Sequence, residues 1–287
     1  MKDFIITCSS TCDLTPYYLR QHNMYYVSFY YYINDERFYD DFYKEHTVDN
    51  FYSTIKNATV KTSQPDPEQY CELWRKLIDQ GYDILHIELS SGISGAVNSA
   101  RIAKSMIDEE NTNAKIYVVD SLTACGGYGL LLDKLYEYKK NHNEIDDVYK
   151  YAEDIKKKIK VVFLVENLDQ LIKGGRISKV KGSIGKLLNI VPILHVESNG
   201  KLESVKNARG LNNAMDDIVN IIEDDIDINN KIFINNSNCY DSAKSMFIKL
   251  KNRYENSNLS EENIYNVGTV IGAHTGSGAI VVSYISK

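Results

Sequence analysis

The stretch "IELSSGISGAVNSARIA" (residues 87–103) holds the end of an expected strand, a turn of small residues and the start of an expected helix. After the turn, small apolar residues recur at the spacing of a single helix face, at Ala96, Ala100, Ala103 and Ile107. A helix with one apolar face packs against a sheet. The stretch therefore predicts one strand–turn–helix unit of an α/β fold.

Similar units flank this stretch. Short β-rich runs lie at "FIIT" (4–7), "DILHIEL" (83–89) and "KIYVVD" (115–120), and each is followed by turn residues and a helical pattern. The helix expected over 66–81 begins with a capping box and ends at a glycine. Repeated units of this length predict a mostly parallel sheet flanked by helices, in an N-terminal α/β domain over residues 1–158.

The second half is less regular. A hairpin is expected over 192–208, around the strong turn signal Asn199-Gly200. Helix, strand and helix follow, and the chain is expected to end in two strands, "YNVGTVIGAH" (265–274) and "AIVVSYI" (279–285). This pattern predicts a C-terminal α+β domain with a mixed sheet over 159–287. In the first half, the tyrosine-rich "YYVSFYYYI" (25–33) is expected to be one strand.

The composition of the chain argues against several classes of protein. The chain has 287 residues and a net charge of −6, which argues against a general nucleic-acid binder because such a protein needs a basic surface. Its five scattered cysteines form no CxxC pair and match no histidine spacing, so we expect reduced thiols and no metal or cofactor. No apolar run is long enough for a signal peptide or a membrane span, and we expect a cytoplasmic protein without stable membrane insertion.

The turn after residue 89 is the first candidate site. In an open parallel sheet, ligands bind at the carboxyl ends of strands, where a helix N-terminus attracts anions. Gly92 and Gly95 are expected to let the backbone approach a ligand, and Ser94 either binds that ligand or only caps the helix. The chain has no P-loop or dinucleotide fingerprint, and the esterase motif G-x-S-x-G fails by one position. Nucleotide and esterase sites are therefore disfavoured here.

Three further clusters carry candidate chemistry. Thr62 and Ser63 lie just before the capped helix, where hydroxyl groups often serve the backbone. The segment 172–188 is the basic patch of an acidic chain, and is either solvated surface or a contact for an anion or a partner. His274 and Thr275 lie in a glycine-rich turn expected between two strands, and glycine costs stability unless a turn needs it.

In this order, the clusters resemble the DegV family of bacterial fatty-acid-binding proteins, and the match covers almost the whole chain. No single motif is specific, but the ordered set is. One departure stands at Cys8-Ser9-Ser10, because the first strand of the family usually ends in Thr-Asp-Ser, so Ser9 replaces the acid. The matching motifs are "STCDL" (10–14), "TSQPDP" (62–67), "SSGISGAVNSA" (90–100), "VVDS" (118–121), "GGRIS" (174–178), "KNARG" (206–210) and "IGAHTGSGAI" (271–280).

The resemblance implies a carrier that catalyses no reaction itself. Such a protein buries one long-chain fatty acid in a ligand cleft between its two domains. It presents the carboxylate to a soluble fatty acid kinase, which makes acyl-phosphate for phospholipid synthesis. Arg176 matches a supporting position near the carboxylate, and Arg209 matches a surface position linked to the kinase. The residues expected to contact the carboxylate are Thr62, Ser63, Ser94, Gly95, His274 and Thr275.

Two alternatives stay open. A serine acyl-hydrolase or transferase using Ser94 and His274 requires a third group to orient the imidazole and an oxyanion hole, and the sequence shows no obvious acid for the first task. A lipid-sensing module without a kinase partner has the same sequence features as a carrier. Fatty-acid length, saturation and oligomeric state do not follow from the spacing of these residues.

Overall fold

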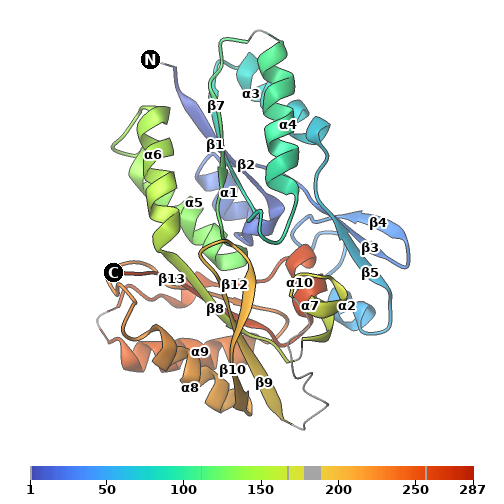
Figure 1. Cartoon of the computed structure of the whole chain (residues 1–287), viewed down its shortest axis with the longest axis vertical. Coiled ribbons are helices and arrows are strands. Elements are labelled where there is room, and N and C mark those ends of the chain that lie inside the picture. The colour runs from blue at the N-terminus through green and yellow to red at the C-terminus, as the bar shows by residue number, and fades with distance from the viewer. Residues whose placement is uncertain (1, 111, 167, 178–188, 256) are drawn as a thin grey trace.

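The computed structural model describes residues 2–110, 112–166, 168–177, 189–255 and 257–287. Three sheets organise these residues (Figure 1). A parallel sheet with its helices forms the N-terminal half of the molecule, a larger mixed sheet forms the C-terminal half, and a small antiparallel sheet lies beside both. Among the described residues, no helix is both long and apolar enough to cross a lipid bilayer.

The first sheet is parallel throughout, with the strand order β2-β1-β6-β7. Helices α3 and α4 cover one face, while α5 and α6 pack on the other, so the predicted parallel sheet flanked by helices is confirmed. The strands are β1 (Phe4–Ser9), β2 (Tyr25–Val27), β6 (Asp83–Glu88) and β7 (Ile116–Asp120). The helices of this half are α1 (Pro16–Gln21), α3 (Pro67–Asp79), α4 (Ala96–Glu109), α5 (Cys125–Lys139) and α6 (Ile145–Ile155).

Local sequence explains these elements well. Strand β1 is buried on both faces because Phe4 and Ile6 join the core under α5, while Ile5 joins the core under α3 and α4. Helix α3 begins with the expected capping box, in which Asp66 and Gln69 each accept a hydrogen bond from the backbone N–H of the other. The apolar face expected for α4 is buried at all four of its positions.

The second sheet is mixed, with the order β10-β9-β8-β13-β11-β12, and only β11 and β12 pair in parallel among these strands. Helices α8 (Leu211–Ile222) and α9 (Tyr240–Arg253) cover its outer face, while α5 packs on the inner face and so connects the two halves. The mixed sheet is as predicted. Its strands are β8 (Ile159–Leu164), β9 (Ile190–Val196), β10 (Leu202–Arg209), β11 (Phe233–Asn236), β12 (Ile264–Asn266) and β13 (Ile280–Ile285). The assignment of two domains that meet at residues 158 and 159 stays a prediction.

The third sheet, β4-β3-β5, shows that the prediction of a single strand over 25–33 was wrong. This stretch forms β2 and then β3, which belong to different sheets, because the chain turns at Phe29, whose N–H donates to the Ser10 hydroxyl. The small sheet packs against a short C-terminal helix, α10. Its elements are β3 (Tyr30–Ile33), β4 (Glu36–Tyr39), β5 (Val60–Ser63) and the adjoining α2 (Val48–Ile55).

The strand predicted over 265–274 is also wrong. Only β12 is extended, and the segment continues as helix α10 (Thr269–Thr275). Its valine, threonine and isoleucine residues favour a strand on propensity, but tertiary packing decides the outcome. Gly272 lies so close to the Tyr52 ring that a Cβ atom there would clash with it. His274 and Thr275 consequently lie at the end of a helix, and the turn into β13 comes after them.

Candidate functional site

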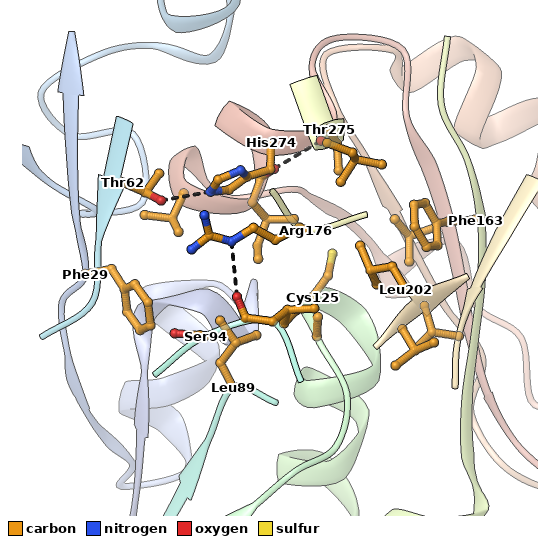
Figure 2. A pocket seen from close by; sticks show the side chains of 18 of the residues that line it. Phe29, Thr62, Leu89, Ser94, Cys125, Phe163, Arg176, Leu202, His274 and Thr275 are labelled. Carbon is orange, nitrogen blue, oxygen red and sulfur yellow. Dashed lines mark hydrogen bonds between the residues drawn. The ribbon is translucent and has the colours of Figure 1, made fainter. Parts of the chain in front are cut away.

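A cavity of about 340 Å³ lies between the parallel sheet and the inner face of the mixed sheet (Figure 2). Residues that follow the carboxyl ends of β6 and β7 form one wall, and the inner face of β8, β9, β10 and β13 forms another. Strand β5, helix α10 and the segment after α7 (Asp169–Lys173) complete it. The cavity therefore lies at the edge of the parallel sheet where ligands bind in open α/β folds.

The cavity has two chemically different ends, which Figure 2 shows on opposite sides of the view. Outside the two ends, which are defined next, most of the residues that line the cavity are apolar. We call "polar end" the group Thr62, Ser63, Gln64, Ser94, Arg176 and His274. We call "apolar end" the group Val161, Phe163, Val196, Leu202 and Val281.

The closest contact at the polar end joins Thr62 on β5 to His274 on α10. The Oγ1 and Nε2 atoms lie 2.8 Å apart. Burial, together with the positive charge of Arg176, lowers the pKa of His274 to about 4. On the far side of the ring, Gly174 leaves room for Nδ1 that a Cβ atom would occupy. His274 is therefore a neutral imidazole at pH 7, fixed between β5 and the end of α7.

Arg176 supplies the positive charge of the site. Helix α7 ends in a turn in which Gly175 has a φ of 71°, and this turn directs Arg176 back into the cavity. Its Nε donates to the carbonyl oxygen of Ile93 at 3.1 Å, and its Nη1 donates to that of Gly174 at 2.6 Å. Burial lowers the pKa of Arg176, but a guanidinium group stays charged in proteins.

Among the described residues that line the cavity, none is aspartate or glutamate, so no carboxylate of theirs opposes this charge. Arg176 is the one of these residues with a permanent positive charge. Neutral hydroxyl, amide and imidazole groups supply the remaining polar atoms. Such a site favours a single anionic group, with room for an apolar body beside it.

Ser94 lies both at the start of α4 and in the cavity wall. Its Oγ accepts a hydrogen bond from the N–H of Ala96 at 3.2 Å, at the start of α4, and the same side chain lines the cavity. Ser63 and Thr275 line the cavity too, but their hydroxyl groups donate to nearby backbone carbonyl oxygens, of Gln64 and Ile271. Contact between these three side chains and a ligand stays a prediction.

The glycines of the turn after β6 serve protein packing. A Cβ atom on Gly92 would lie 2.5 Å from the carbonyl carbon of Gly200, at the tip of the β9–β10 hairpin. A Cβ atom on Gly95 would lie 2.5 Å from Oε1 of Gln64. Neither glycine lines the cavity, so Gly92 brings the hairpin close rather than the ligand. Ser90 strengthens this contact, because its hydroxyl donates to the Gly200 carbonyl oxygen at 2.9 Å.

The two arginines assigned to a supporting role and to partner contact lie in different places. Arg176 lines the cavity, whereas Arg209 is exposed at the end of β10 and does not. Of the basic patch predicted over 172–188, Lys173 is exposed at the end of α7. Residues 178–188, with Lys179, Lys181 and Lys186, lie outside the described residues.

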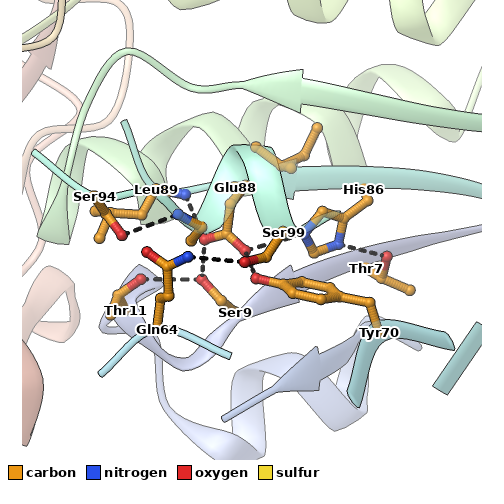
Figure 3. Close-up of polar contacts among 12 residues, drawn as sticks. Thr7, Ser9, Thr11, Gln64, Tyr70, His86, Glu88, Leu89, Ser94 and Ser99 are labelled. Atoms are coloured by element: carbon orange, nitrogen blue, oxygen red, sulfur yellow. Dashed lines mark hydrogen bonds and ion pairs between the residues drawn. The ribbon is translucent and has the colours of Figure 1, made fainter. Parts of the chain in front are cut away.

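A buried polar network below the cavity was missed from the sequence (Figure 3). Glu88, at the end of β6, is fully buried and accepts hydrogen bonds from the Ser9 hydroxyl at 2.6 Å, the Tyr70 hydroxyl at 2.7 Å and the Leu89 N–H at 2.6 Å. His86 Nε2 lies 3.2 Å from the same carboxylate. An acid inside the apolar run "DILHIEL" was the available signal, because buried carboxylates need partners.

This network bears on the departure at Ser9. Ser9 stands where the family usually has an acid, and its hydroxyl donates to a carboxylate supplied by the neighbouring strand. The end of β1 therefore still adjoins an acidic group. Gln64 was also missed, although it lines the cavity and its Nε2 donates to the Ser99 hydroxyl at 2.8 Å, which fixes β5 against α4.

The fold and the cavity define an α/β small-molecule-binding protein. The chain belongs to the DegV family, because the family sequence model described as "Uncharacterised protein, DegV family" matches residues 3–287. A DegV domain-containing protein of Clostridium perfringens is 32% identical over 288 residues, covering 99% of this chain and 98% of the relative.

Solved structures agree with this assignment. Bacillus subtilis DegV, described as a fatty acid binding protein, is 27% identical with a TM-score of 0.83, and all of both chains is covered. The Streptococcus pneumoniae Fatty Acid Kinase (Fak) B3 protein, loaded with linoleic acid, shares the fold with a TM-score of 0.86 at 22% identity, over 99% of this chain and 100% of that one.

Proposed function

We propose that this protein binds one long-chain fatty acid in the cavity, with the alkyl tail at the apolar end and the carboxylate at the polar end. The observation that carries the proposal is the charge distribution of the described residues that line the cavity: they provide a wall of apolar side chains, one guanidinium group and no carboxylate. A fatty acid has the matching distribution, with one anionic group on a long apolar chain. The described function of the Bacillus subtilis relative supports the same ligand class.

Burial of the tail provides most of the affinity. Each methylene group removed from water contributes about 0.8 kcal/mol, so a tail of roughly fourteen such groups gives on the order of 11 kcal/mol before the entropy costs of binding. One hydrogen bond contributes about 1 kcal/mol net. The apolar end thus sets how tightly the ligand binds, and the polar end sets where the carboxylate lies.

The polar end suits a carboxylate that must remain reactive. Thr62 and Ser94 are neutral hydroxyl groups, and His274 is neutral at pH 7 because its pKa is about 4. Arg176 donates two of its N–H groups to backbone carbonyl oxygens, which fix the guanidinium group and leave its other N–H groups for an anion. A carboxylate held in this way keeps a lone pair for attack on a phosphoryl group.

We propose further that the protein is a cytoplasmic carrier subunit that presents the carboxylate to a soluble fatty acid kinase, which forms acyl-phosphate for phospholipid synthesis. The nucleotide and metal chemistry of phosphoryl transfer then belongs to the kinase, and the carrier needs no cofactor of its own. Exposed Arg209 is the contact we propose for that partner. The motif match to the carrier family supports this role, and the shared fold with the pneumococcal protein is consistent with it.

A serine acyl-hydrolase fits the geometry less well. His274 Nε2 pairs with Thr62, while the Ser94 hydroxyl accepts from a backbone N–H at the start of α4. A histidine with a pKa of about 4 is a weak general base at pH 7. Its charged neighbour in the cavity is the cation Arg176, where a catalytic triad has a carboxylate.

Native mass spectrometry tests ligand binding directly. After removal of copurified lipid, we expect the full chain to bind one equivalent of a long-chain fatty acid. A spectrum that shows only unliganded protein after incubation with fatty acids of several chain lengths would contradict the proposal. Measurement of fatty-acid release from acyl esters, with Ser94→Ala as the control, separates the carrier from the hydrolase.

A reconstituted assay tests the kinase role. Loaded protein, ATP, Mg²⁺ and a purified bacterial fatty acid kinase should yield acyl-phosphate, which hydroxylamine traps as a hydroxamate. We expect Arg209→Glu to lower the rate without changing fatty-acid binding, whereas Arg37→Glu, an exposed arginine on the third sheet, should leave both unchanged. Fatty-acid binding without phosphorylation would favour the lipid-sensing module instead.

A further inference from the structure

A cluster of three potential metal ligands lies on the β9–β10 hairpin, outside the cavity. His195 on β9 and Glu203 on β10 are directly paired across the antiparallel ladder. Glu197 follows His195 by two residues, and side chains at this spacing along extended chain point to the same face. Val196 and Leu202, which alternate with these residues, line the cavity on the opposite face. The cluster therefore lies on the face of the hairpin that points away from the cavity.

The three ligand atoms are close enough for one ion. His195 Nε2 lies 2.7 Å from Glu197 Oε1 and 3.6 Å from Glu203 Oε2, and the three atoms all lie within 4.8 Å of one another. Zinc binds nitrogen and oxygen ligands at about 2.0–2.2 Å, so the ligands of a tetrahedral site are separated by about 3.4 Å. Small rotamer changes bring the observed atoms to that spacing.

The charges around the cluster also favour a cation. Neither Glu197 nor Glu203 forms an ion pair with a lysine or arginine among the described residues, and both lie next to His195. Two carboxylates this close together carry like charges, and a divalent ion between them offsets their repulsion. The side chains of His195, Glu197 and Glu203 keep 37%, 34% and 64% of their exposure, so an ion reaches them from solvent.

We propose that His195, Glu197 and Glu203 bind one zinc ion, or a divalent transition metal of similar preference, with the fourth position open to water. The imidazole nitrogen favours these metals over Mg²⁺ and Ca²⁺, which prefer all-oxygen sites. This site could not be predicted from the sequence, because H-x-E followed by a glutamate six residues later matches no common metal motif. The register of the β9–β10 hairpin brings these three side chains together.

Isothermal titration calorimetry of the full chain tests the site. The protein is treated with EDTA, desalted and titrated with ZnCl₂ at pH 7.5. We expect one zinc ion per chain in the wild type, and loss of this binding in both His195→Ala and Glu203→Gln at concentrations that saturate the wild type. Binding should also weaken at pH 5.5, because a metal-binding imidazole must be deprotonated. Zinc should raise the melting temperature of the wild type but not that of His195→Ala.

Two control variants separate this site from other zinc-binding groups. His142→Ala removes a half-buried histidine at the far end of α5, and Cys239→Ser removes the cysteine that is not fully buried; both should bind zinc as the wild type does. Absence of zinc binding in the wild type, or equal binding by His195→Ala, would overturn the proposal. Equal affinity for Mg²⁺ would overturn the choice of metal. Circular dichroism establishes that each variant is folded.

Discussion

The two ends of the cavity are built in different ways. The apolar end is one continuous surface, formed by alternate residues of adjacent strands in the mixed sheet. The polar end is assembled from four separate segments, the end of β5, the turn after β6, the turn after α7 and the end of α10. The first depends on one sheet, whereas the second depends on how several parts of the chain pack together.

We expect the two ends to have different roles in ligand binding. Apolar burial is non-directional and scales with area, so a smooth sheet face is enough to provide affinity. Hydrogen bonds to a carboxylate depend on distance and angle, so the groups that make them must be fixed individually. Thr62, His274 and Arg176 are each held by at least one hydrogen bond within the protein. We therefore expect substitutions at the apolar end to change affinity, and those at the polar end to change geometry.

The largest effect is expected from a charge at the apolar end. Leu202→Glu places a carboxylate where we propose that the alkyl tail binds, and burying an unpaired charge costs several kcal/mol. We expect fatty-acid binding to fall below detection in native mass spectrometry and in a fluorescent fatty-acid displacement assay.

Val205→Glu is the matched control, because this valine lies on the same strand, is 43% exposed and does not line the cavity. It should bind fatty acid as the wild type does. If Leu202→Glu bound the ligand normally, the apolar end would not hold the tail.

The next effect concerns the buried imidazole at the polar end. Burial lowers the pKa of His274 to about 4, whereas the unfolded chain has a value near 6.5. As the pH falls from about 6.5 to 4, the unfolded state takes up a proton that the folded state does not, so stability is lost over this window. The loss attributable to His274 is at most about 3 kcal/mol.

Urea unfolding of the ligand-free protein from pH 8 to pH 4 measures this loss. His274→Gln keeps a group that pairs with Thr62 but does not titrate, so its stability should fall less steeply below pH 6.5. The difference between the two proteins at pH 8 serves as the baseline. Parallel curves down to pH 4 would show that His274 is not a buried neutral imidazole.

The sequence predicted the apolar end better than the polar end, for a physical reason. Strands β1, β6 and β13 and the buried face of α4 follow from short-range sequence patterns, and β13 belongs to the mixed sheet that carries the apolar wall. Thr62, Ser94, Arg176 and His274 were found through the motif resemblance, and the residues alone did not show that they meet. Helix α10 was misassigned because its β-branched residues are held in a helix by contacts with α2 and the third sheet.

Other features were hidden because they depend on tertiary contacts. Gly92 looked like a ligand contact from its place after β6, but its neighbour is the distant hairpin tip. Glu88 looked like one polar residue in a buried strand, and its partners come from β1 and α3. Sequence spacing shows which residues share an element, but it does not show which elements pack together.

The close contact between Gly92, in the turn after β6, and Gly200, at the hairpin tip, offers a third test. Gly92→Ala sets a Cβ atom against the backbone of Gly200, which cannot move without shifting the hairpin that carries Leu202 and Val196. We expect a loss of about 1–3 kcal/mol in the free energy of unfolding, as for overpacked sites, together with weaker fatty-acid binding.

Gly95→Ala is the matched control, because the new Cβ atom meets the end of the Gln64 side chain rather than backbone. That side chain can rotate away at the cost of its hydrogen bond to Ser99, about 1 kcal/mol. We expect it to lose less stability than Gly92→Ala in urea titrations. Equal losses for the two variants would mean that the hairpin tip is not held tightly against the turn after β6.

The smallest effect on affinity is expected at the polar end itself. Thr62→Val keeps the shape of the side chain but removes the hydroxyl group that pairs with His274. Loss of one hydrogen bond costs about 1 kcal/mol, or roughly a fivefold rise in Kd. Acyl-phosphate formation by the kinase should fall further than this, because the carboxylate is no longer held in one orientation.

Thr59→Val is the control, because this threonine is exposed just before β5. It should change neither the Kd for the fatty acid nor the rate of acyl-phosphate formation. If Thr62→Val weakened binding as strongly as Leu202→Glu, while phosphorylation of the bound fatty acid stayed normal, the polar end would supply affinity rather than orientation.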